Sequence, residues 1–154
     1  MLWDVRNDSD ALFSLYGISL QTVYDVQLLE VAFRQSRNKY SKTVKGLGTA
    51  VQEYVKPDPQ WTEVKKAGKA LLFPELGGRF ELFEERPLES RILAYAANDV
   101  SLLFRLGTVL EEGIYGNRVK WKQRVLEASK KRVVESHQAA YDPDGKGRAL
   151  SPKI

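Results

Sequence analysis

Apolar residues recur at intervals of three and four positions along most of the chain, which predicts a largely helical protein. The clearest stretch runs from residue 88 to residue 110 and predicts one continuous amphipathic helix. Its apolar face consists of Leu88, Ile92, Leu103, Leu106 and Leu110. The same periodicity predicts helices over 10–16, 27–35, 45–54 and 61–72, and a basic helix over 118–132. Helices therefore dominate the predicted secondary structure.

Extended structure is predicted in only two short stretches, residues 2–5 and 22–26. Residues 74–83 contain Pro74, Gly77 and Gly78, a composition typical of a loop or a short hairpin. Two short strands cannot form a sheet that supports this many helices. Either the protein is all-helical with strand-like loops, or the other strands of its sheet lie outside these residues.

A carboxylate interrupts the apolar face of the helix predicted over 88–110. Asp99 lies in the middle of that face, and Tyr95 lies one turn before it. A buried carboxylate is destabilising unless a cation, a metal ion or several hydrogen-bond donors satisfy it. A phenol and a carboxylate at positions i and i+4 can together face a metal-bound water. The alternative is an aspartate at the edge of the core that bonds to a neighbouring loop.

The composition restricts the class of protein. A chain of 154 residues is expected to form one domain. The chain contains no cysteine, which excludes disulfides, cysteine zinc sites and thiol nucleophiles. No long apolar run and no secretory signal pattern are evident, so we predict an intracellular protein without a transmembrane segment. The sequence does not decide between nucleus and cytoplasm.

The positive charge of the chain is concentrated in residues 118–132. This segment has seven basic residues and one glutamate, so the rest of the chain is net negative although the whole chain carries +4. A basic strip suits a phosphate backbone, and Lys120, Lys122 and Arg124 are the candidate nucleic-acid-binding residues. The alternative is a solvated helix face. Apolar residues at seven-residue intervals predict that one side of this helix packs on the body of the protein: Val119, Leu126 and Val133.

Four stretches resemble the ribonuclease D-like 3′–5′ exonuclease family, in the branch of the DEDD superfamily that has tyrosine in its third motif. Residues 4–12 with 16–18 resemble the second motif, and residues 23–27 resemble the strand-to-helix junction that follows it. Residues 86–88 with 93–100 resemble the third motif. Residues 72–78 and 147–152 resemble fungal members. The resemblance extends over nearly the whole chain.

This resemblance implies an α/β fold of the RNase H-like exonuclease type and metal-dependent hydrolysis at a nucleic-acid 3′ end, RNA or DNA. In the family, four carboxylates hold two divalent ions, Mg²⁺ or Mn²⁺, which stabilise the attacking and leaving oxygens. By motif position, Asp99 would ligate the ion that binds the nucleophilic water. Asp10 would help to hold the second ion, and Tyr95 would orient the attacking water. A helix-dipole role in the first turn is the alternative for Asp10.

The first motif of the family, Asp-x-Glu, does not occur in this sequence. We therefore expect a family member without its N-terminal sheet, predominantly helical with few short strands and with little or no activity of its own. The third-motif helix would pack against that sheet, so an apolar surface is expected to be exposed and to promote self-association or partner binding. The predicted organisation is a partial exonuclease domain over 1–116, with a basic helix and tail over 117–154 packed on it.

Two other interpretations remain beside the exonuclease. One is a catalytically dead relative that binds RNA or a protein partner, and the other is a helical domain with no ligand. His137 and Asp142 have the spacing of the sister branch, whose third motif contains histidine. No second-motif pattern precedes them at a suitable distance, so this pair does not change the assignment.

Overall fold

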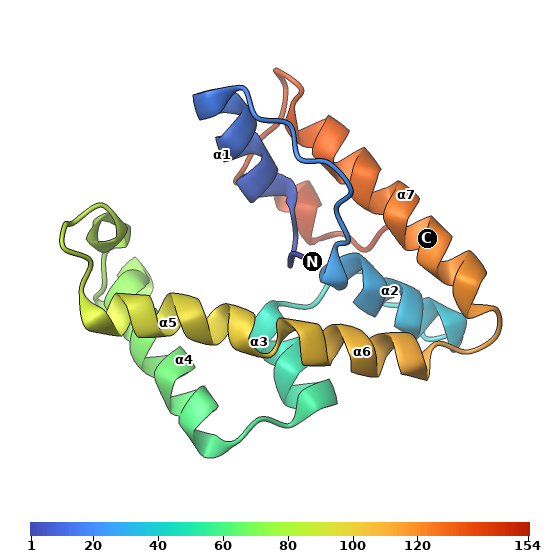
Figure 1. Ribbon diagram of the computed structural model, residues 1–154, viewed down its shortest axis with the longest axis horizontal. Helices are drawn as coiled ribbons and strands as arrows, with labels where there is room; N and C mark the ends of the chain where they lie inside the picture. The colour runs from blue at the N-terminus through green and yellow to red at the C-terminus, as the bar shows by residue number, and fades with distance from the viewer.

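The computed structural model describes residues 1–154 as a set of helices joined by short connections, without a β-sheet (Figure 1). The α-helices are α1 (Arg6–Tyr16), α2 (Val26–Ser36), α3 (Leu47–Ala50), α4 (Pro59–Leu72), α5 (Ser90–Ser101), α6 (Leu103–Gly113) and α7 (Arg118–Ser136). A π-helical turn, η1 (Val51–Val55), continues α3, and three 3₁₀ turns complete the structure: η2 (Pro74–Leu76), η3 (Phe80–Phe83) and η4 (Lys146–Ala149). The predicted predominance of helices is confirmed.

The two predicted strands are reduced to one parallel bridge between Leu2 and Asp25. Val5 already has helical backbone angles because α1 begins directly after it. The prediction of strands over 2–5 and 22–26 is therefore wrong in extent. The helix predicted over 45–54 is present as α3 and η1, and the loop predicted over 74–83 consists of two 3₁₀ turns.

Helix α2 lies at the centre of the molecule, where it packs against both α6 and α7 (Figure 1). Leu28, Leu29 and Ala32 are fully buried in the main core. A helix buried on nearly every side must pair its charged residues, and Glu30 accordingly accepts a bidentate bond from Arg34 at 2.7 and 2.8 Å. The Asp25 carboxylate caps the start of the helix by accepting from the Gln27 amide at 2.9 Å.

The helix predicted over 88–110 is two helices, α5 and α6, which follow one another almost in line (Figure 1). Leu102 separates them because its backbone (φ −104°, ψ 2°) leaves the helical conformation. Ile92, Leu106 and Leu110 are buried, as the apolar periodicity predicts. Leu88 is only partly buried because it precedes the helix.

The opposite side of α5 and α6 carries exposed apolar side chains. Leu93 is 59% exposed, Val100 62% and Phe104 71%. These residues follow one helical face at spacings of seven and four. The apolar face expected to be exposed is therefore buried inside the chain, and different apolar residues of the helix are exposed instead. Self-association stays a prediction that sedimentation at several protein concentrations can test.

One helical run, Ser90–Gly113, is long and apolar enough to cross a membrane by length and composition alone. This differs from the absence of any such run predicted above. Only 22% of the apolar window is buried, and Leu103, Leu106 and Leu110 of this run pack into the main core.

Helix α7 packs on α1 and α2 through a face other than the predicted one. Val119 is 79% exposed and Leu126 is 37% exposed, so the predicted stripe is wrong at two of its three positions. The buried face follows Val125, Ser129, Arg132 and Ser136, with Val133 beside it. This shift occurs because buried polar partners on α2 and at the N-terminus hold Ser129 and Arg132. The tail then returns to α2, where the Gln35 side chain bonds to Pro152 and Ile154.

Candidate functional site

The candidate site lies where α4 pairs with α5 in the opposite chain direction. Helix α4 begins with Pro59 after Asp58, whose carboxylate accepts from the Trp61 amide at 2.9 Å. At one end of the pairing, the Trp61 indole donates to the Asn98 carbonyl at 3.0 Å and the Asn98 amide donates back to the Trp61 carbonyl at 3.1 Å. At the other end, Leu72 and Ile92 share a small core cluster. Both ends of the pairing are therefore fixed.

Between these ends, Gly68 permits the closest approach of the two helices. A Cβ atom at position 68 would lie 2.6 Å from the Cβ atom of Tyr95, far inside contact distance. The absence of a side chain at Gly68 lets the Tyr95 ring pack directly on the backbone of α4. This contact buries Tyr95 to 9% exposure.

The register of α4 against α5 brings Lys65 onto the predicted third-motif pair. The Lys65 ammonium forms an ion pair with Asp99 and lies 3.4 Å from the Tyr95 hydroxyl. It also lies 4.8 Å from the centre of the Tyr95 ring, within cation–π range. The side chain of Asp99 is 26% exposed and that of Lys65 is 12% exposed. The carboxylate in the apolar face is thus satisfied by a lysine, a partner that the sequence pattern left open.

The Tyr95 phenol is held in its neutral form. Burial raises the pKa of Tyr95 to about 12, with further contributions from the charge of Asp99 and from a hydrogen bond to it. At neutral pH the phenol is therefore a hydrogen-bond donor and acceptor, and it is not a base. This state suits the predicted task of orienting a water molecule.

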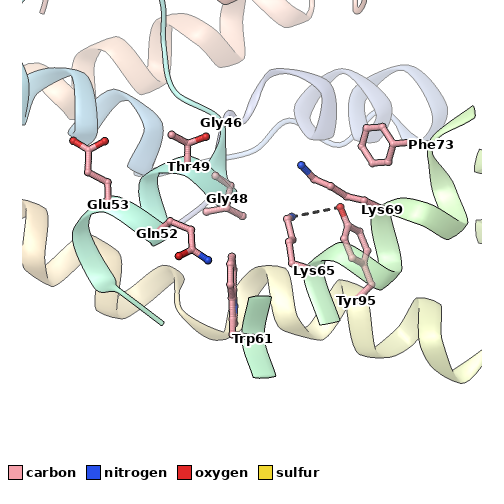
Figure 2. Close-up of a pocket in the computed structure, with 11 residues that line it drawn as sticks. Gly46, Gly48, Thr49, Gln52, Glu53, Trp61, Lys65, Lys69, Phe73 and Tyr95 are labelled. Carbon is pink, nitrogen blue, oxygen red and sulfur yellow. Dashed lines mark hydrogen bonds between the residues drawn. The ribbon is translucent and has the colours of Figure 1, made fainter. Parts of the chain in front are cut away.

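A groove of about 740 Å³ opens beside Tyr95 between α4 and the α3–η1 segment (Figure 2). Lys65 and Lys69 lie on one side of it, one turn apart on α4. Trp61 and Phe73 supply aromatic surface, and the Lys69 ammonium lies 6.0 Å from the centre of the Phe73 ring. The opposite side consists of residues of α3 and η1 and of the glycine just before α3: Gly46, Leu47, Gly48, Thr49, Gln52 and Glu53.

The charge of the groove is net positive. Lys65 is balanced by Asp99, and Glu53 is balanced by Lys45, which also lowers the pKa of the Glu53 carboxyl. Lys69 is exposed and enters no ion pair. The groove therefore presents an uncompensated ammonium beside the Phe73 ring, an arrangement that suits an anionic ligand with a planar group.

The structure does not bring Asp10 to this site. Asp10 lies on α1, where its carboxylate accepts from the Ser14 hydroxyl at 3.0 Å. Helix α1 packs on α7, and Figure 1 shows α1 and α5 well apart. His137, the histidine of the sister-branch spacing, joins α1 to α7 because its ring stacks on Phe13 and bonds to the Ser9 hydroxyl at 3.0 Å.

A pair of divalent ions does not fit the residues gathered here. Mg²⁺ and Mn²⁺ prefer several oxygen ligands with negative charge. No three histidine, aspartate or glutamate side chains lie together in a way that could hold a metal ion. Asp99 faces an ammonium, and Asp10 is on another helix. That Asp10 and Asp99 ligate metal ions stays a prediction. These two residues alone do not form a site for two ions.

The three predicted nucleic-acid-binding residues lie on the exposed surface of α7. Lys120, Lys122 and Arg124 are all exposed. The Lys122 ammonium is 3.9 Å from Glu111, and the Arg124 guanidinium stacks over Trp121 at 5.1 Å. Figure 1 shows α7 on the far side of α2 from α4, so this strip is separate from the groove. Arg132, from the same basic segment, is buried and takes no part in the exposed strip.

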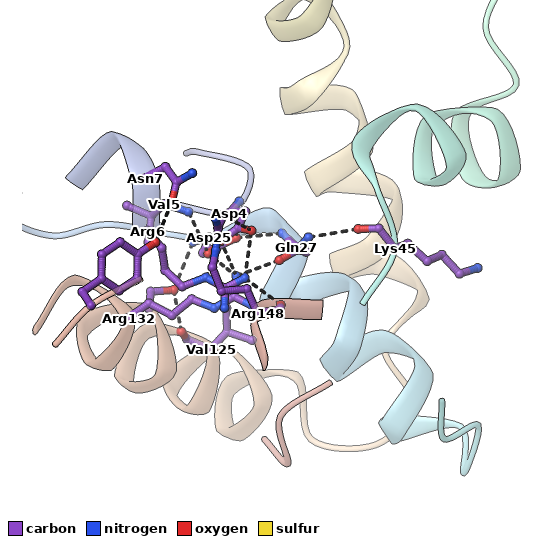
Figure 3. Close-up of polar contacts among 12 residues, drawn as sticks. Asp4, Val5, Arg6, Asn7, Asp25, Gln27, Lys45, Val125, Arg132 and Arg148 are labelled. Atoms are coloured by element: carbon purple, nitrogen blue, oxygen red, sulfur yellow. Dashed lines mark hydrogen bonds and ion pairs between the residues drawn. The ribbon is translucent and has the colours of Figure 1, made fainter. Parts of the chain in front are cut away.

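Arg132 belongs to a buried ionic junction that the sequence pattern did not reveal (Figure 3). Its guanidinium donates to Asp25 at 2.7 Å and to the Gln27 side chain at 2.9 Å. Asp25 also accepts from the backbone amides of Asp4 and Val5 at 3.0 and 3.2 Å. The position of Arg132, seven residues after Val125 on the same helix face, is the one sequence signal that could have indicated its burial.

Beside this junction, Asp4 forms a second set of contacts with cationic side chains. Arg6 donates to it in bidentate fashion at 2.7 and 2.8 Å, and Arg148 lies 3.6 Å away. Burial alone would raise the pKa of Asp4, but the bond from Arg6 and the charges of Arg132 and Arg148 outweigh it and lower the pKa. The junction ties the N-terminus, α2, α7 and the tail together.

The sequence over residues 1–114 matches a protein-family model described as 3′–5′ exonuclease. No curated protein and no solved structure matches the chain. The matched range extends from the N-terminus through α6. It includes Asp10, Tyr95 and Asp99 and excludes α7.

Proposed function

Because the chain belongs to the 3′–5′ exonuclease family, we propose that the groove beside Tyr95 and Asp99 binds the 3′ end of a nucleic acid. We propose further that these 154 residues bind the strand without cleaving it. The observation that carries the proposal is the uncompensated ammonium of Lys69 beside the Phe73 ring, in the groove that Tyr95 of the third-motif pair also lines. Within the family, the placement of Tyr95 and Asp99 one turn apart supports assignment to the ribonuclease D-like branch with a tyrosine third motif.

The chemistry of the groove suits a single strand, RNA or DNA. Ammonium groups contact phosphates without reading sequence, and aromatic rings stack on any base. Lys69 can meet a phosphate, and the exposed part of Phe73 can meet a base. We therefore expect sequence-tolerant binding that weakens as salt rises.

We expect no cleavage because a two-metal reaction needs several carboxylates to hold its ions. In the complete family site, Mg²⁺ or Mn²⁺ would be held by Asp99, by Asp10 and by the two carboxylates of the first motif, and the ions would stabilise both reacting oxygens. The first-motif pattern does not occur in this sequence, and Lys65 neutralises Asp99. The chain alone therefore lacks the negative charge that two divalent ions require.

Fluorescence anisotropy with labelled single-stranded RNA and DNA tests the binding. Lys69→Glu should weaken binding by about tenfold or more and lower the salt dependence by about one phosphate contact. The matched control is Lys66→Glu, an exposed residue of the same helix outside the groove. Equal affinity in both variants would contradict the placement in the groove. Cleavage of the same oligonucleotides in Mg²⁺ or Mn²⁺ by the wild-type chain would contradict the second part of the proposal.

The exposed strip of α7 is the competing nucleic-acid surface, and the same assay separates it from the groove. Replacing Lys120, Lys122 and Arg124 by glutamate changes the charge of α7 but leaves the groove intact. If this triple variant loses binding while Lys69→Glu retains it, the strip and not the groove holds the strand. Loss of nucleic-acid binding in both variants would indicate that the strand contacts both the groove and the exposed strip of α7.

A protein-binding module is the second candidate function. The exposed apolar side chains of Leu93, Val100 and Phe104 favour it, because contiguous apolar surface often marks an interaction site. Complete absence of nucleic-acid binding at low salt would make this the better interpretation.

A further inference from the structure

We infer that Lys65 is a built-in counter-ion that takes the position beside Asp99 at which the family would place a divalent metal. Its ammonium has three hydrogen atoms to donate. The structure directs the group at the Asp99 carboxylate and sets it 3.4 Å from the Tyr95 hydroxyl. The ring of Tyr95 adds a cation–π contact at 4.8 Å. The Lys65 side chain thus contacts both functional groups of the third motif, the Asp99 carboxylate and the Tyr95 phenol.

The position of Lys65 is imposed by the pairing of α4 with α5. Trp61 is held to Asn98 by two reciprocal hydrogen bonds, one turn before Lys65. Gly68 meets Tyr95 one turn after Lys65. With both neighbouring turns fixed, the side chain of Lys65 lies opposite Asp99, and it is 12% exposed. Lys66, the next residue, is exposed on the same helix.

This arrangement opposes metal binding for two reasons. A divalent ion at Asp99 would lie within a few ångströms of an ammonium, and like charges at that distance repel strongly. Beside Asp99, the only other oxygen of the motif is the Tyr95 phenol, which is neutral and already faces Lys65. The protein therefore supplies its own cation where the family chemistry needs an external one.

The test is Mn²⁺ binding to the full chain, measured by electron paramagnetic resonance and by paramagnetic broadening of the amide signals of Tyr95 and Asp99. The wild-type chain should show no Asp99-dependent site. Lys65→Met removes the ammonium and should create Asp99-dependent Mn²⁺ broadening that the wild-type chain lacks even at a Mn²⁺ concentration about tenfold higher. Lys66→Met, which removes the same charge from an exposed position, should behave as the wild type. Lys65→Met combined with Asp99→Asn should lose the gain.

Lys65→Gln serves as a second variant, because glutamine can still bond to Asp99 but carries no charge, and circular dichroism establishes that each variant is folded. Mn²⁺ broadening at Asp99 in the wild-type chain would overturn the inference. A folded Lys65→Gln or Lys65→Met chain that gains no affinity for Mn²⁺ would overturn it as well. Because no nucleic acid is present, this outcome is independent of the binding proposed above.

Discussion

Two aspartates of this protein each face a basic side chain, and the surroundings of the two pairs differ sharply. Asp25 is fully buried and accepts from three backbone amides as well as from Arg132. The side chain of Asp99 is 26% exposed, and its one charged partner is Lys65, which lines the groove. Every acceptor position of the Asp25 carboxylate is used. The Asp99 carboxylate still has an acceptor position for a further hydrogen-bond donor.

The difference in surroundings indicates different roles for Asp25 and Asp99. A fully satisfied buried carboxylate fixes the elements that surround it. A partly exposed carboxylate that is bonded to a single cation does not fix several elements in this way. We therefore assign Asp25 to the framework and Asp99 to the candidate site.

The largest effect is expected from Arg132→Met, which leaves the buried carboxylate of Asp25 without its cation. Removing one partner of a buried ion pair typically destabilises by about 3–5 kcal/mol. Urea unfolding followed by tryptophan fluorescence measures the loss. The matched control is Lys131→Met, since Lys131 is 77% exposed on the same helix and its replacement should change stability by no more than about 0.5 kcal/mol. Similar losses in the two variants would contradict the assignment of Asp25 and Arg132 to the framework.

A smaller loss is expected from Gly68→Ala, which inserts a methyl group into the contact between α4 and Tyr95. Overpacking at such a contact destabilises by about 1–3 kcal/mol, although alanine favours a helix by up to about 1 kcal/mol over glycine. Gly48→Ala is the control, because its Cβ atom would meet only Lys65 Cε at an ordinary 3.7 Å. The control should be neutral or slightly stabilising. A Gly68→Ala chain as stable as the wild type would show that the two helices do not approach as described.

The smallest effects are expected from pH, and they have opposite signs in the two regions. The pKa of Asp4, at the ionic junction, is lowered from 3.8, so its stabilisation is present above pH 3.8 and is lost as pH falls through the lower folded value. The pKa of Tyr95, at the groove, is raised from 10.0 to about 12, so its stabilisation is present below pH 10 and is lost as pH rises toward 12. Unfolding free energies across pH, compared with Asp4→Asn and Tyr95→Phe, should show a flatter acid limb in the first and a flatter alkaline limb in the second. An unchanged limb in either variant would contradict the assigned cause.

Much of the helical framework could be predicted from the sequence, because apolar periodicity and capping residues act locally. Asp58 caps the start of α4, Pro59 is its first residue, and Gly17 ends α1 in the left-handed conformation. The break at Leu102 could not be predicted, since the apolar pattern continues through it. It arises from the packing of two helices on different neighbours: α5 on α4, and α6 on α2.

The candidate site could be predicted in part. The unusual position of Asp99 and its spacing from Tyr95 are visible in the sequence and are brought together in the structure. The partner Lys65 was missed because it lies 34 residues earlier, on a helix whose register depends on Gly68 and Trp61. The junction of Asp25 with Arg132 spans 107 residues and was missed for the same reason. Contacts between distant segments are set by packing and not by local pattern.

We propose that the groove between α4 and the α3–η1 segment binds a nucleic-acid end without a metal ion. The most direct measurement is a titration of the isotope-labelled chain with a short single-stranded oligonucleotide in the presence of a chelator, followed by amide chemical shifts. Progressive shifts of Lys65, Lys69 and Tyr95, with α7 unaffected, are the predicted result. Shifts confined to α7, or shifts at the groove that appear only after Mg²⁺ is added, would contradict the account.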